Sequence, residues 1–428
     1  MLSKEDNELL TRTGAGAPMG NLIRRYWIPA LLSEEIPTPD CPPVRVRLLG
    51  EELVAFRDSA GRIGLIDEHC AHRGTSLFFG RNEECGLRCV YHGWKYDVEG
   101  NVVDTPAEPP GSDFRKKLRQ TAYPTHETAG VIHAYLGPRD KMPLFPHYEW
   151  TQVPLNQTYV TKSLLECNYL QGLEGECDSS HLSWLHQTFT PGPARAIWRL
   201  DPSPVYETEE TDFGVRLVAT RKAGPEQQYV RVSSFVMPVF GCVPAGRAPG
   251  ELDGFEVHIY VPFNDTLAWR YDLGFRRSRP VEEHEVHRRK QIGPDYRRVR
   301  NARNNYLQDR QAQKAVNYTG IEDFLNHDAC ATESMGAIFD RSKEHLGVSD
   351  KAVIAVRKYL LSAVKTLQEG GEPPHTLRDP ARNRFPHVDC FAELLPSDIH
   401  WRQRFDYLSS AATKANPAAF VPKRKAVS

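Results

Sequence analysis

Hydrophobic and polar positions change their spacing along the chain, and this change predicts a β-rich first part followed by a mixed second part. Short alternating runs separated by turn residues predict strands at 44–49, 53–57, 62–66, 91–96 and 130–137. Longer runs predict an antiparallel sheet from strands at 214–221, 229–237, 255–263 and 267–275. The expected fold class is therefore α+β, with a β-rich domain and a larger domain whose antiparallel sheet is flanked by helices.

Helical spacing is clearest in residues 350–368, where apolar side chains recur every three or four positions. Ser349 or Asp350 could cap the start of this helix, and Gly370 would end it. A second helical stretch is expected around 165–187, while 280–345 reads as charged, polar and irregular. We expect three parts: a helical N-terminal segment at 1–40 that packs with the larger domain, a β-rich domain at 41–150, and the larger domain at 151–428.

Composition adds the expectation of a soluble enzyme. The 428 residues include 25% charged and 40% hydrophobic side chains, and the net charge is −1. Nothing in this balance indicates a nucleic acid partner or an anionic membrane surface. The polar start of the chain and the lack of an 18-residue apolar run favour the cytoplasm and no membrane span. Nine thinly spread cysteines also fit a reducing compartment better than a disulfide framework.

Two short motifs combine thiolate and imidazole donors. Cys70 and His72 are separated by sixteen intervening residues from Cys89 and His92. Two cysteines and two histidines are the ligands of a Rieske 2Fe–2S cluster, in which histidines replace two cysteines on one iron. A structural zinc site is the alternative, but zinc sites favour CxxC and HxxxH pairs of like ligands. His69 is interpreted as a flanking residue, and Cys85 as structural.

A second group of donors lies in the segment 168–186. Asp178, His181 and His186 form the pattern Asp-x-x-His-x4-His, and the two histidines could supply two ligands of a 2-His-1-carboxylate iron site. In an ideal α-helix residues five apart lie about 140° apart around the axis. We therefore expect the helix to be distorted or to end between these histidines. The third ligand must be a carboxylate from elsewhere, and composition alone does not choose between Asp323 and Asp328.

The motifs Cys70-x-His72-Arg73-Gly74 and Cys89-x-x-His92-Gly93-Trp94-Lys95-Tyr96 resemble those of the Rieske non-haem iron oxygenases that hydroxylate aromatic rings. The leader 19–27, the segment 168–171 and Glu333-Ser334-Met335-Gly336 resemble the phthalate-dioxygenase-like branch, which needs no β subunit. His133 departs from that branch, where Trp is more usual. The resemblance selects Asp328 as the third iron ligand, with Asp323 as the fallback.

The resemblance also implies how the two centres cooperate. Asp178 would accept a hydrogen bond from the cluster ligand His92 of a neighbouring subunit and contact His181. The working pair of centres would then form across the interface of a homo-oligomer, a trimer or a dimer of trimers. An NAD(P)H-dependent flavin and ferredoxin reductase would supply electrons through the 2Fe–2S cluster to a mononuclear non-haem Fe(II) that uses O2.

The substrate expected from the resemblance is an aromatic carboxylate other than phthalate, because two pocket arginines could not be placed. Ser179 and Arg247 are candidate substrate contacts, and a surface position is an equal alternative for Arg247. Ring cis-dihydroxylation and O-demethylation of a methoxylated aromatic or biaryl acid both use this metal chemistry. A Rieske electron carrier without oxygenase activity would explain only the first motif, because some 270 residues would then have no task.

Overall fold

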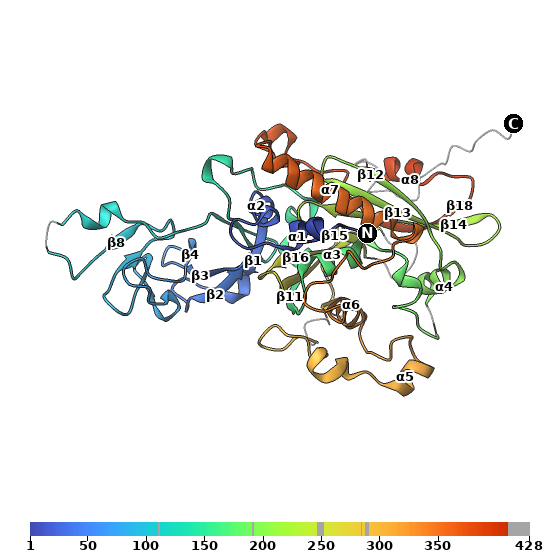
Figure 1. Cartoon of the computed structure of the whole chain (residues 1–428), viewed down its shortest axis with the longest axis horizontal. Helices are drawn as coiled ribbons and strands as arrows, with labels where there is room; N and C mark the ends of the chain where they lie inside the picture. The colour runs from blue at the N-terminus through green and yellow to red at the C-terminus, as the bar shows by residue number, and fades with distance from the viewer. Residues whose placement is uncertain (110–111, 191, 246–251, 284, 287–290, 410–428) are drawn as a thin grey trace.

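The computed structural model describes residues 1–109, 112–190, 192–245, 252–283, 285–286 and 291–409. These residues form two lobes, a smaller β-rich one on the left of Figure 1 and a larger one on the right that contains a long antiparallel sheet with helices. This is the α+β arrangement that the hydrophobic pattern predicts. None of the helices in the described ranges is long and apolar enough to cross a membrane.

Two small antiparallel sheets build the smaller lobe. The first has the order β2-β3-β4 (Val44–Leu48, Glu51–Arg57, Ile63–Asp67), and the second the order β5-β6-β7-β8 (Arg81–Glu83, Gly86–Arg88, Lys95–Tyr96, Val102–Asp104). In β2, Val46 and Leu48 are buried while Arg45 and Arg47 are exposed, as expected of a strand with one solvated face. The prediction of a strand over 91–96 was wrong in part, because only its last two residues pair and the others form a turn.

A third sheet links the lobes. Its order is β1-β10-β9 (Trp27–Leu32, Val131–Tyr135, Thr125–Thr128), and every residue of β1 and β10 is buried. The segment 1–40 was predicted to be helical, but it also contains β1, which follows two short helices. His133, on β10, pairs with His126 on β9.

The sheet of the larger lobe has eight antiparallel strands within the described residues. Its order is β11-β17-β16-β15-β14-β13-β12, and β18 pairs with β14. Four of these strands were predicted within two residues, and four were not predicted. The strands are β11 (Thr158–Leu165), β12 (Val205–Glu210), β13 (Gly214–Lys222), β14 (Gln227–Val236), β15 (Phe240–Pro244), β16 (Phe255–Pro262), β17 (Ala268–Phe275) and β18 (Phe391–Pro396).

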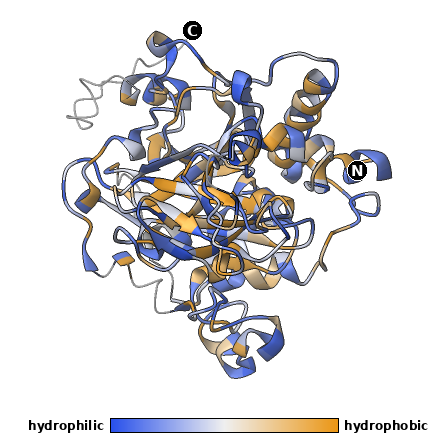
Figure 2. Cartoon of the chain, turned by 90° about the vertical axis from the view of Figure 1, so that its left-hand side faces the viewer, coloured by the Kyte–Doolittle hydropathy of each residue, from blue (hydrophilic) through white to orange (hydrophobic). Residues whose placement is uncertain are grey.

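Helices cover this sheet and carry the residues of interest. α3 packs against β15 and β16 on one side and contacts α6 and α7, while α1 and α2 contact α7 (Figure 1). Figure 2 shows the apolar colours concentrated in the interior strands and on the inner faces of helices. The helices are α1 (Lys4–Thr11), α2 (Pro18–Ile23), α3 (Tyr169–Cys177), α4 (Pro193–Leu200), α5 (Arg310–Ala315), α6 (Phe324–Glu333), α7 (Lys351–Gln368) and α8 (Trp401–Leu408).

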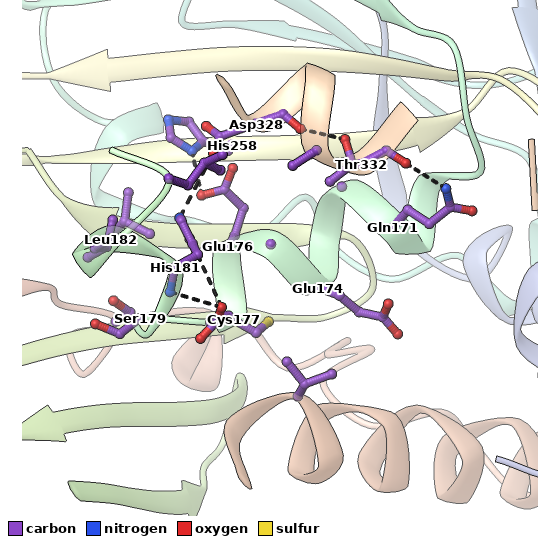
Figure 3. A pocket seen from close by; sticks show the side chains of 18 of the residues that line it. Gln171, Glu174, Glu176, Cys177, Ser179, His181, Leu182, His258, Asp328 and Thr332 are labelled. Atoms are coloured by element: carbon purple, nitrogen blue, oxygen red, sulfur yellow. Dashed lines mark hydrogen bonds and ion pairs between the residues drawn. The ribbon is translucent and has the colours of Figure 1, made fainter. Parts of the chain in front are cut away.

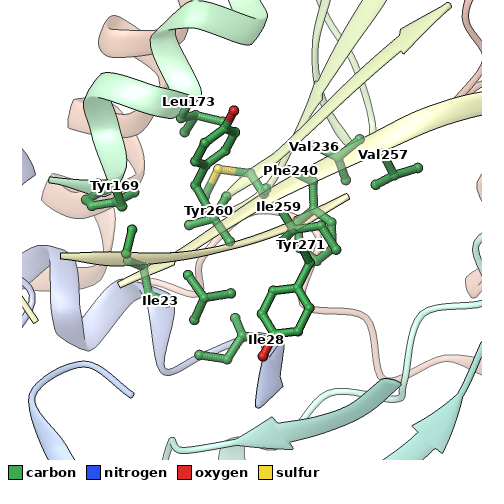
Figure 4. Packing of buried hydrophobic residues seen from close by; sticks show 14 of the residues in the cluster. Ile23, Ile28, Tyr169, Leu173, Val236, Phe240, Val257, Ile259, Tyr260 and Tyr271 are labelled. Carbon is green, nitrogen blue, oxygen red and sulfur yellow. The ribbon is translucent and has the colours of Figure 1, made fainter. Parts of the chain in front are cut away.

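The N-terminal helices, α3 and the sheet share one core. Ile23 and Ile28 lie beside Tyr169 of α3 and Ile259 of the sheet (Figure 4), and none of the four is more than 1% exposed. Burial of aliphatic and aromatic side chains of this size stabilises a fold by about 1.5–3 kcal/mol each. Glu174 fixes α3 from the other side, because its carboxylate accepts hydrogen bonds from Arg341 and from Arg357 of α7.

Two helical predictions need correction. The helix expected around 165–187 is shorter, since α3 ends at Cys177 and a 3-10 turn follows at His181–Ser183. The region 280–345 is not wholly irregular, because it contains α5 and α6. The helix predicted at 350–368 is confirmed as α7, and Gly370 at φ +84° follows its end. Asp350 precedes α7 without a side-chain cap, and its carboxylate instead accepts a hydrogen bond from the Gly347 amide.

Candidate metal centres

Two loops of the smaller lobe bring Cys70, His72, Cys89 and His92 together. Both cysteines are buried, and the rings of the two histidines lie with centroids 4.6 Å apart. Each loop closes through an amide of a glycine, Gly74 N to Cys70 O at 2.8 Å and Gly93 N to Cys89 O at 3.1 Å. These glycines have φ of +76° and +78°, a backbone conformation that L side chains rarely adopt. The loops therefore need glycine to present the donors on one side.

The surroundings of these donors fit a 2Fe–2S cluster. Trp94 stacks on His72 with ring centroids 4.5 Å apart, and the Tyr96 hydroxyl lies 3.0 Å from the Cys70 sulfur. Nδ1 of His72 is buried and has no hydrogen-bond partner in the described part of the chain. Burial and the neighbouring Cys70 thiol raise the pKa of Cys89. Two thiols held side by side and an unpartnered imidazole nitrogen are the arrangement that iron ions would satisfy.

The other residues near the motif stay outside this group. His69 is exposed and faces Glu52 and Asp67. Cys85 lies in the turn between β5 and β6 at φ +58°, where its amide donates to the Ser59 hydroxyl. All nine cysteines lie in described ranges, and none of them forms a disulfide there.

In the larger lobe His181, His186 and Asp328 converge. One donor atom of each lies within 4.8 Å of the others. Nε2 of His186 is 2.9 Å and Nε2 of His181 is 3.9 Å from Oδ1 of Asp328. His181 begins a 3-10 turn after α3 has ended, and Asp328 comes from α6. In an unbroken helix His181 and His186 would point in different directions. Because α3 ends before His181, both histidines can face the same point.

Hydrogen bonds set the tautomer of His186. Nε2 of His327 lies 2.8 Å from the Ile321 carbonyl oxygen, which can only accept, so this nitrogen carries the proton. Nδ1 of His327 is then an acceptor, and Nδ1 of His186 at 3.2 Å donates to it. Nε2 of His186 is left with a lone pair that faces Oδ1 of Asp328 at 2.9 Å, so two electron-pair donors point at the same place. The tautomer therefore suits a metal ligand.

His181 is oriented in a similar way. Its Nδ1 lies 3.3 Å from Oδ2 of Asp178, so Nδ1–H donates to this carboxylate and Nε2 faces Asp328. Burial raises the pKa of Asp178, but hydrogen bonds from His181 and from the Ser180 amide outweigh it and the pKa is lowered. A carboxylate that holds a metal-bound imidazole in this way is common in metal sites.

Burial and the neighbouring charges shift the pKa values of the three donors. His186 is completely buried, and burial lowers its pKa to about 4. Burial would raise the pKa of Asp328, but the attraction of His186 and His181 holds it well below its usual range. The ring of Phe324 stacks on His186 at 3.5 Å. Burial would lower the pKa of His181, but Asp178 and Asp328 raise it. The site thus offers two imidazoles and one carboxylate, the donor set of a facial iron(II) site with open positions.

A cavity of about 270 Å³ opens onto two of these donors, His181 and Asp328. Figure 3 shows His181 and Asp328 facing it together with Glu176 and His258. Its wall is largely apolar, and Leu182, Leu217, Val243 and Phe324 are among the lining residues. The lining also contains Arg231, whose side chain forms no ion pair or hydrogen bond with a described residue. Arg270 and Arg357 also line it, but they are paired with Asp272 and Glu174. A largely apolar cavity with one arginine that is unpaired among the described residues can bind an organic anion.

The other candidate site residues from the sequence are Ser179, Asp323 and Arg247. Ser179 lines the cavity, and its hydroxyl accepts a hydrogen bond from Arg221 at 3.1 Å. Asp323, the fallback ligand, is the N-cap of α6 and accepts a hydrogen bond from the Leu325 amide, so it does not join the donor group. Arg247 lies outside the described residues.

Sequence reasoning missed several residues of the site. Tyr206 of β12 donates to Asp178 at 3.2 Å and accepts from the Ser179 amide at 2.9 Å. His327 is adjacent to Asp328 in the sequence, which could have marked it as a neighbour. Nothing in the sequence marks Tyr206 or Arg231, because long connections bring their strands to the cavity.

Comparisons with known proteins agree with both centres. A family model for the Rieske [2Fe-2S] domain matches residues 26–124, and a model described as LigXa C-terminal domain like matches residues 134–419. The oxygenase subunit of phthalate 4,5-dioxygenase from Pseudomonas putida is 40% identical over 94% of each chain.

The chain belongs to the Rieske non-haem iron oxygenases.

This Rieske oxygenase resembles the phthalate-dioxygenase-like branch, as the motifs predict. The oxygenase subunit of 3-chlorobenzoate-3,4-dioxygenase from Comamonas testosteroni is 33% identical over 95% of this chain and 98% of its own. A solved structure of NdmA from Pseudomonas putida with theobromine has a TM-score of 0.60 at 19% identity, over 81% of this chain and 92% of its own. The protein is therefore an oxygenase component with a Rieske 2Fe–2S cluster and a mononuclear non-haem iron.

Proposed function

We propose that this Rieske oxygenase oxidises an aromatic carboxylate other than phthalate, with O2 and with electrons from an NAD(P)H-dependent flavin and ferredoxin reductase. The observation that carries the proposal is the cavity in which His181 and Asp328, two of the three proposed iron ligands, face an apolar wall and Arg231. A guanidinium without a partner in the described residues suits one carboxylate, because it binds it with two parallel hydrogen bonds. The substrates in the names of the two relatives, phthalate and 3-chlorobenzoate, support an aromatic acid.

In this proposal Cys70, His72, Cys89 and His92 hold the cluster, and His181, His186 and Asp328 hold the iron. The cluster supplies single electrons and the iron supplies reactivity with O2. Asp178 orients His181 and would accept a hydrogen bond from His92 of a neighbouring subunit. The buried wall of the cavity excludes water from the substrate ring. Ser179, with its hydroxyl held by Arg221, borders the substrate.

The division of the chain into 1–40, 41–150 and 151–428 is part of the proposal. The smaller lobe has a buried cluster of its own around Val54, Phe56 and Trp94. Leu10, Met19 and other leader residues instead belong to the core that contains the large sheet. The large core also includes Val46, Leu53 and Val131 of 41–150, so only the cluster-bearing part of the smaller lobe has a core of its own. That local core supports a Rieske domain, and the shared core supports a catalytic domain that includes the leader.

A homo-oligomer, a trimer or a dimer of trimers, would complete the electron path. The cluster residues and the iron residues lie in different lobes of one chain (Figure 1). Val90 and Tyr91, beside the cluster ligand His92, are 55% and 56% exposed, and Trp184 beside the iron site is 53% exposed. Exposed apolar residues at both centres suit an interface between two copies, where Asp178 would meet His92 of the neighbour.

The cytoplasm is the proposed location.

The proposal is tested with purified protein and a suitable reductase. Iron and labile sulfide analysis should give three irons and two sulfides per chain, since a 2Fe–2S cluster and one iron are expected. Oxygen uptake is then screened with benzoates, phthalates, methoxybenzoates and biaryl acids, and the products are identified. A cis-diol would indicate ring dihydroxylation, and formaldehyde would indicate O-demethylation. Oxygen uptake that no aromatic acid stimulates would contradict the proposed substrate class.

A further inference from the structure

A second cavity lies beside the iron cavity and shares part of its wall. Its volume is about 550 Å³, against about 270 Å³ for the first. Both cavities are lined by the same five residues, Leu182, Arg231, Val243, His258 and Phe324. Figure 3 shows Leu182 and His258 from the side of the first cavity. A molecule that extends beyond these shared residues would pass from the iron into the second cavity.

Trp198 gives the second cavity an unsatisfied donor. This residue of α4 lines the cavity and is 8% exposed. Its indole Nε1–H is buried and has no hydrogen-bond partner in the described residues. Leaving such a donor without an acceptor costs about 1–3 kcal/mol. An oxygen atom of a bound molecule would remove that cost.

Arg231 gives the boundary a free positive charge. It stands on β14, and Ser233, two residues later on the same face of the strand, lines the first cavity. The two acids of the second cavity are already engaged: Glu256 accepts hydrogen bonds from the Tyr159 hydroxyl, and Asp323 accepts one from the Leu325 amide. The guanidinium is therefore available for a carboxylate of the ligand.

The sizes of the two cavities limit the ligand. Sites for small organic molecules usually measure about 300–1,000 Å³. The first cavity lies just below that range and suits one substituted ring, so a single-ring acid at the iron would leave the larger cavity empty. The second cavity has an apolar part as well, including Val316, Phe324 and Leu325. This lining suits another aromatic ring.

We propose that the second cavity is a subsite for the distal ring of a diaryl acid whose reacting ring lies at the iron. The carboxylate binds Arg231 at the boundary, and an oxygen substituent of the distal ring accepts the hydrogen bond of Trp198. This inference rests on the proposed function and narrows its substrate class from aromatic acids to acids with two rings.

The test is calorimetric binding to the anaerobic holoenzyme, with benzoate, biphenyl-3-carboxylate and its hydroxylated derivatives as probes. Burial of a second ring should make the diaryl acids bind at least about tenfold more tightly than benzoate. Ala245→Phe fills the second cavity, since Ala245 lines only that cavity, and should remove this advantage while benzoate affinity stays within about twofold. Ala245→Ser is the matched control and should behave as the unchanged protein.

Trp198→Phe tests the donor and keeps a ring in place. It should weaken the best hydroxylated diaryl acid by roughly fivefold, the effect of one hydrogen bond, and leave benzoate unchanged. Arg199→Gln, at an exposed position on the same helix, is its control. Equal affinity for one-ring and two-ring acids would overturn the subsite, and so would variants that weaken both classes alike.

Oxygen uptake distinguishes a failure of the proposed subsite from a failure of the proposed function. If benzoates are oxidised while diaryl acids bind no better, the subsite is wrong and the proposed function stands. If diaryl acids bind through Ala245 and Trp198 but no aromatic acid is oxidised, the subsite stands and the proposed function is wrong.

Discussion

Asp178 and His181 are in direct contact at the edge of the iron cavity, where Oδ2 of the carboxylate lies 3.3 Å from Nδ1 of the imidazole. The same carboxylate oxygen accepts the His181 amide at 3.2 Å, and the other accepts the Ser180 amide at 2.7 Å. The carboxylate is thus fixed by the turn that carries the imidazole. It remains 26% exposed, so a neighbouring chain could reach it.

Asp178→Asn should slow electron transfer without loss of either metal centre. The amide keeps the size of the side chain but loses the charge that favours a cluster imidazole of the neighbour. Single-turnover oxidation of the reduced cluster should fall on the order of 100-fold, the upper range for partners of metal-bound imidazoles. Asp295→Asn, at an exposed position, is the control. Rapid cluster oxidation in the Asp178 variant would contradict the bridging role.

His181→Ala should lose the mononuclear iron and keep the cluster. One of three protein ligands disappears, while the cluster residues belong to the other lobe. Metal analysis should fall from three irons to two per chain, with the visible spectrum of the cluster unchanged. His345→Ala, at an exposed position, should retain all three. Three irons in the His181 variant would mean that this residue is not a ligand.

His327→Phe should weaken iron binding although His327 is not one of the three proposed ligands. The substitution keeps an aromatic ring but removes the nitrogen that accepts from Nδ1 of His186. The imidazole of His186 then loses the bond that sets its tautomer, and the affinity for iron(II) should fall roughly 10–100-fold. Titration of the iron-depleted protein measures this change. An unchanged affinity would show that packing by Phe324 alone orients His186.

The variants Cys89→Ser and Cys85→Ser should distinguish a cysteine that binds the cluster from one that is only structural. Cys89 is buried beside Cys70, whereas Cys85 is partly exposed in a turn on the same sheet. The Cys89 variant should lose labile sulfide and the visible cluster spectrum, and the Cys85 variant should keep both. Zinc in place of iron and sulfide in the unchanged protein would contradict a cluster at this site.

His133→Phe should make the stability less dependent on pH. Burial lowers the pKa of His133 to about 3, whereas an unfolded histidine titrates near 6.5. Below pH 6.5 the unfolded chain therefore binds a proton that the folded chain does not, and stability is lost as pH falls. Between pH 6.5 and 5 this loss amounts to about 2 kcal/mol.

Thermal unfolding at pH 7.5 and pH 5 measures the His133 effect. The unchanged protein should lose more in Tm between these pH values than the variant does. His387→Phe, at an exposed position, is the control and should show the full loss. An identical loss in the His133 variant would assign the pH dependence to other groups.

The sequence by itself determined the features that depend on local spacing. The longer hydrophobic runs predicted four strands of the large sheet within two residues, and helical periodicity predicted α7. The cluster motif is also local, because each cysteine stands within three residues of its histidine and a glycine closes each loop. The failed local predictions, the strand at 91–94 and the long helix at 165–187, both fall where loops present candidate ligands and regular structure has to stop.

Only the tertiary structure decided which distant groups meet. Asp323 and Asp328 cannot be distinguished by composition, but the helix α6 turns one into an N-cap and directs the other at His186. Tyr206 and Arg231 come from strands whose order in the sheet no local pattern encodes. The second cavity exists because β14 and α4, which are distant in the sequence, both contribute to its wall. Local spacing fixes which donors are available, and long-range packing fixes where their lone pairs and charges point.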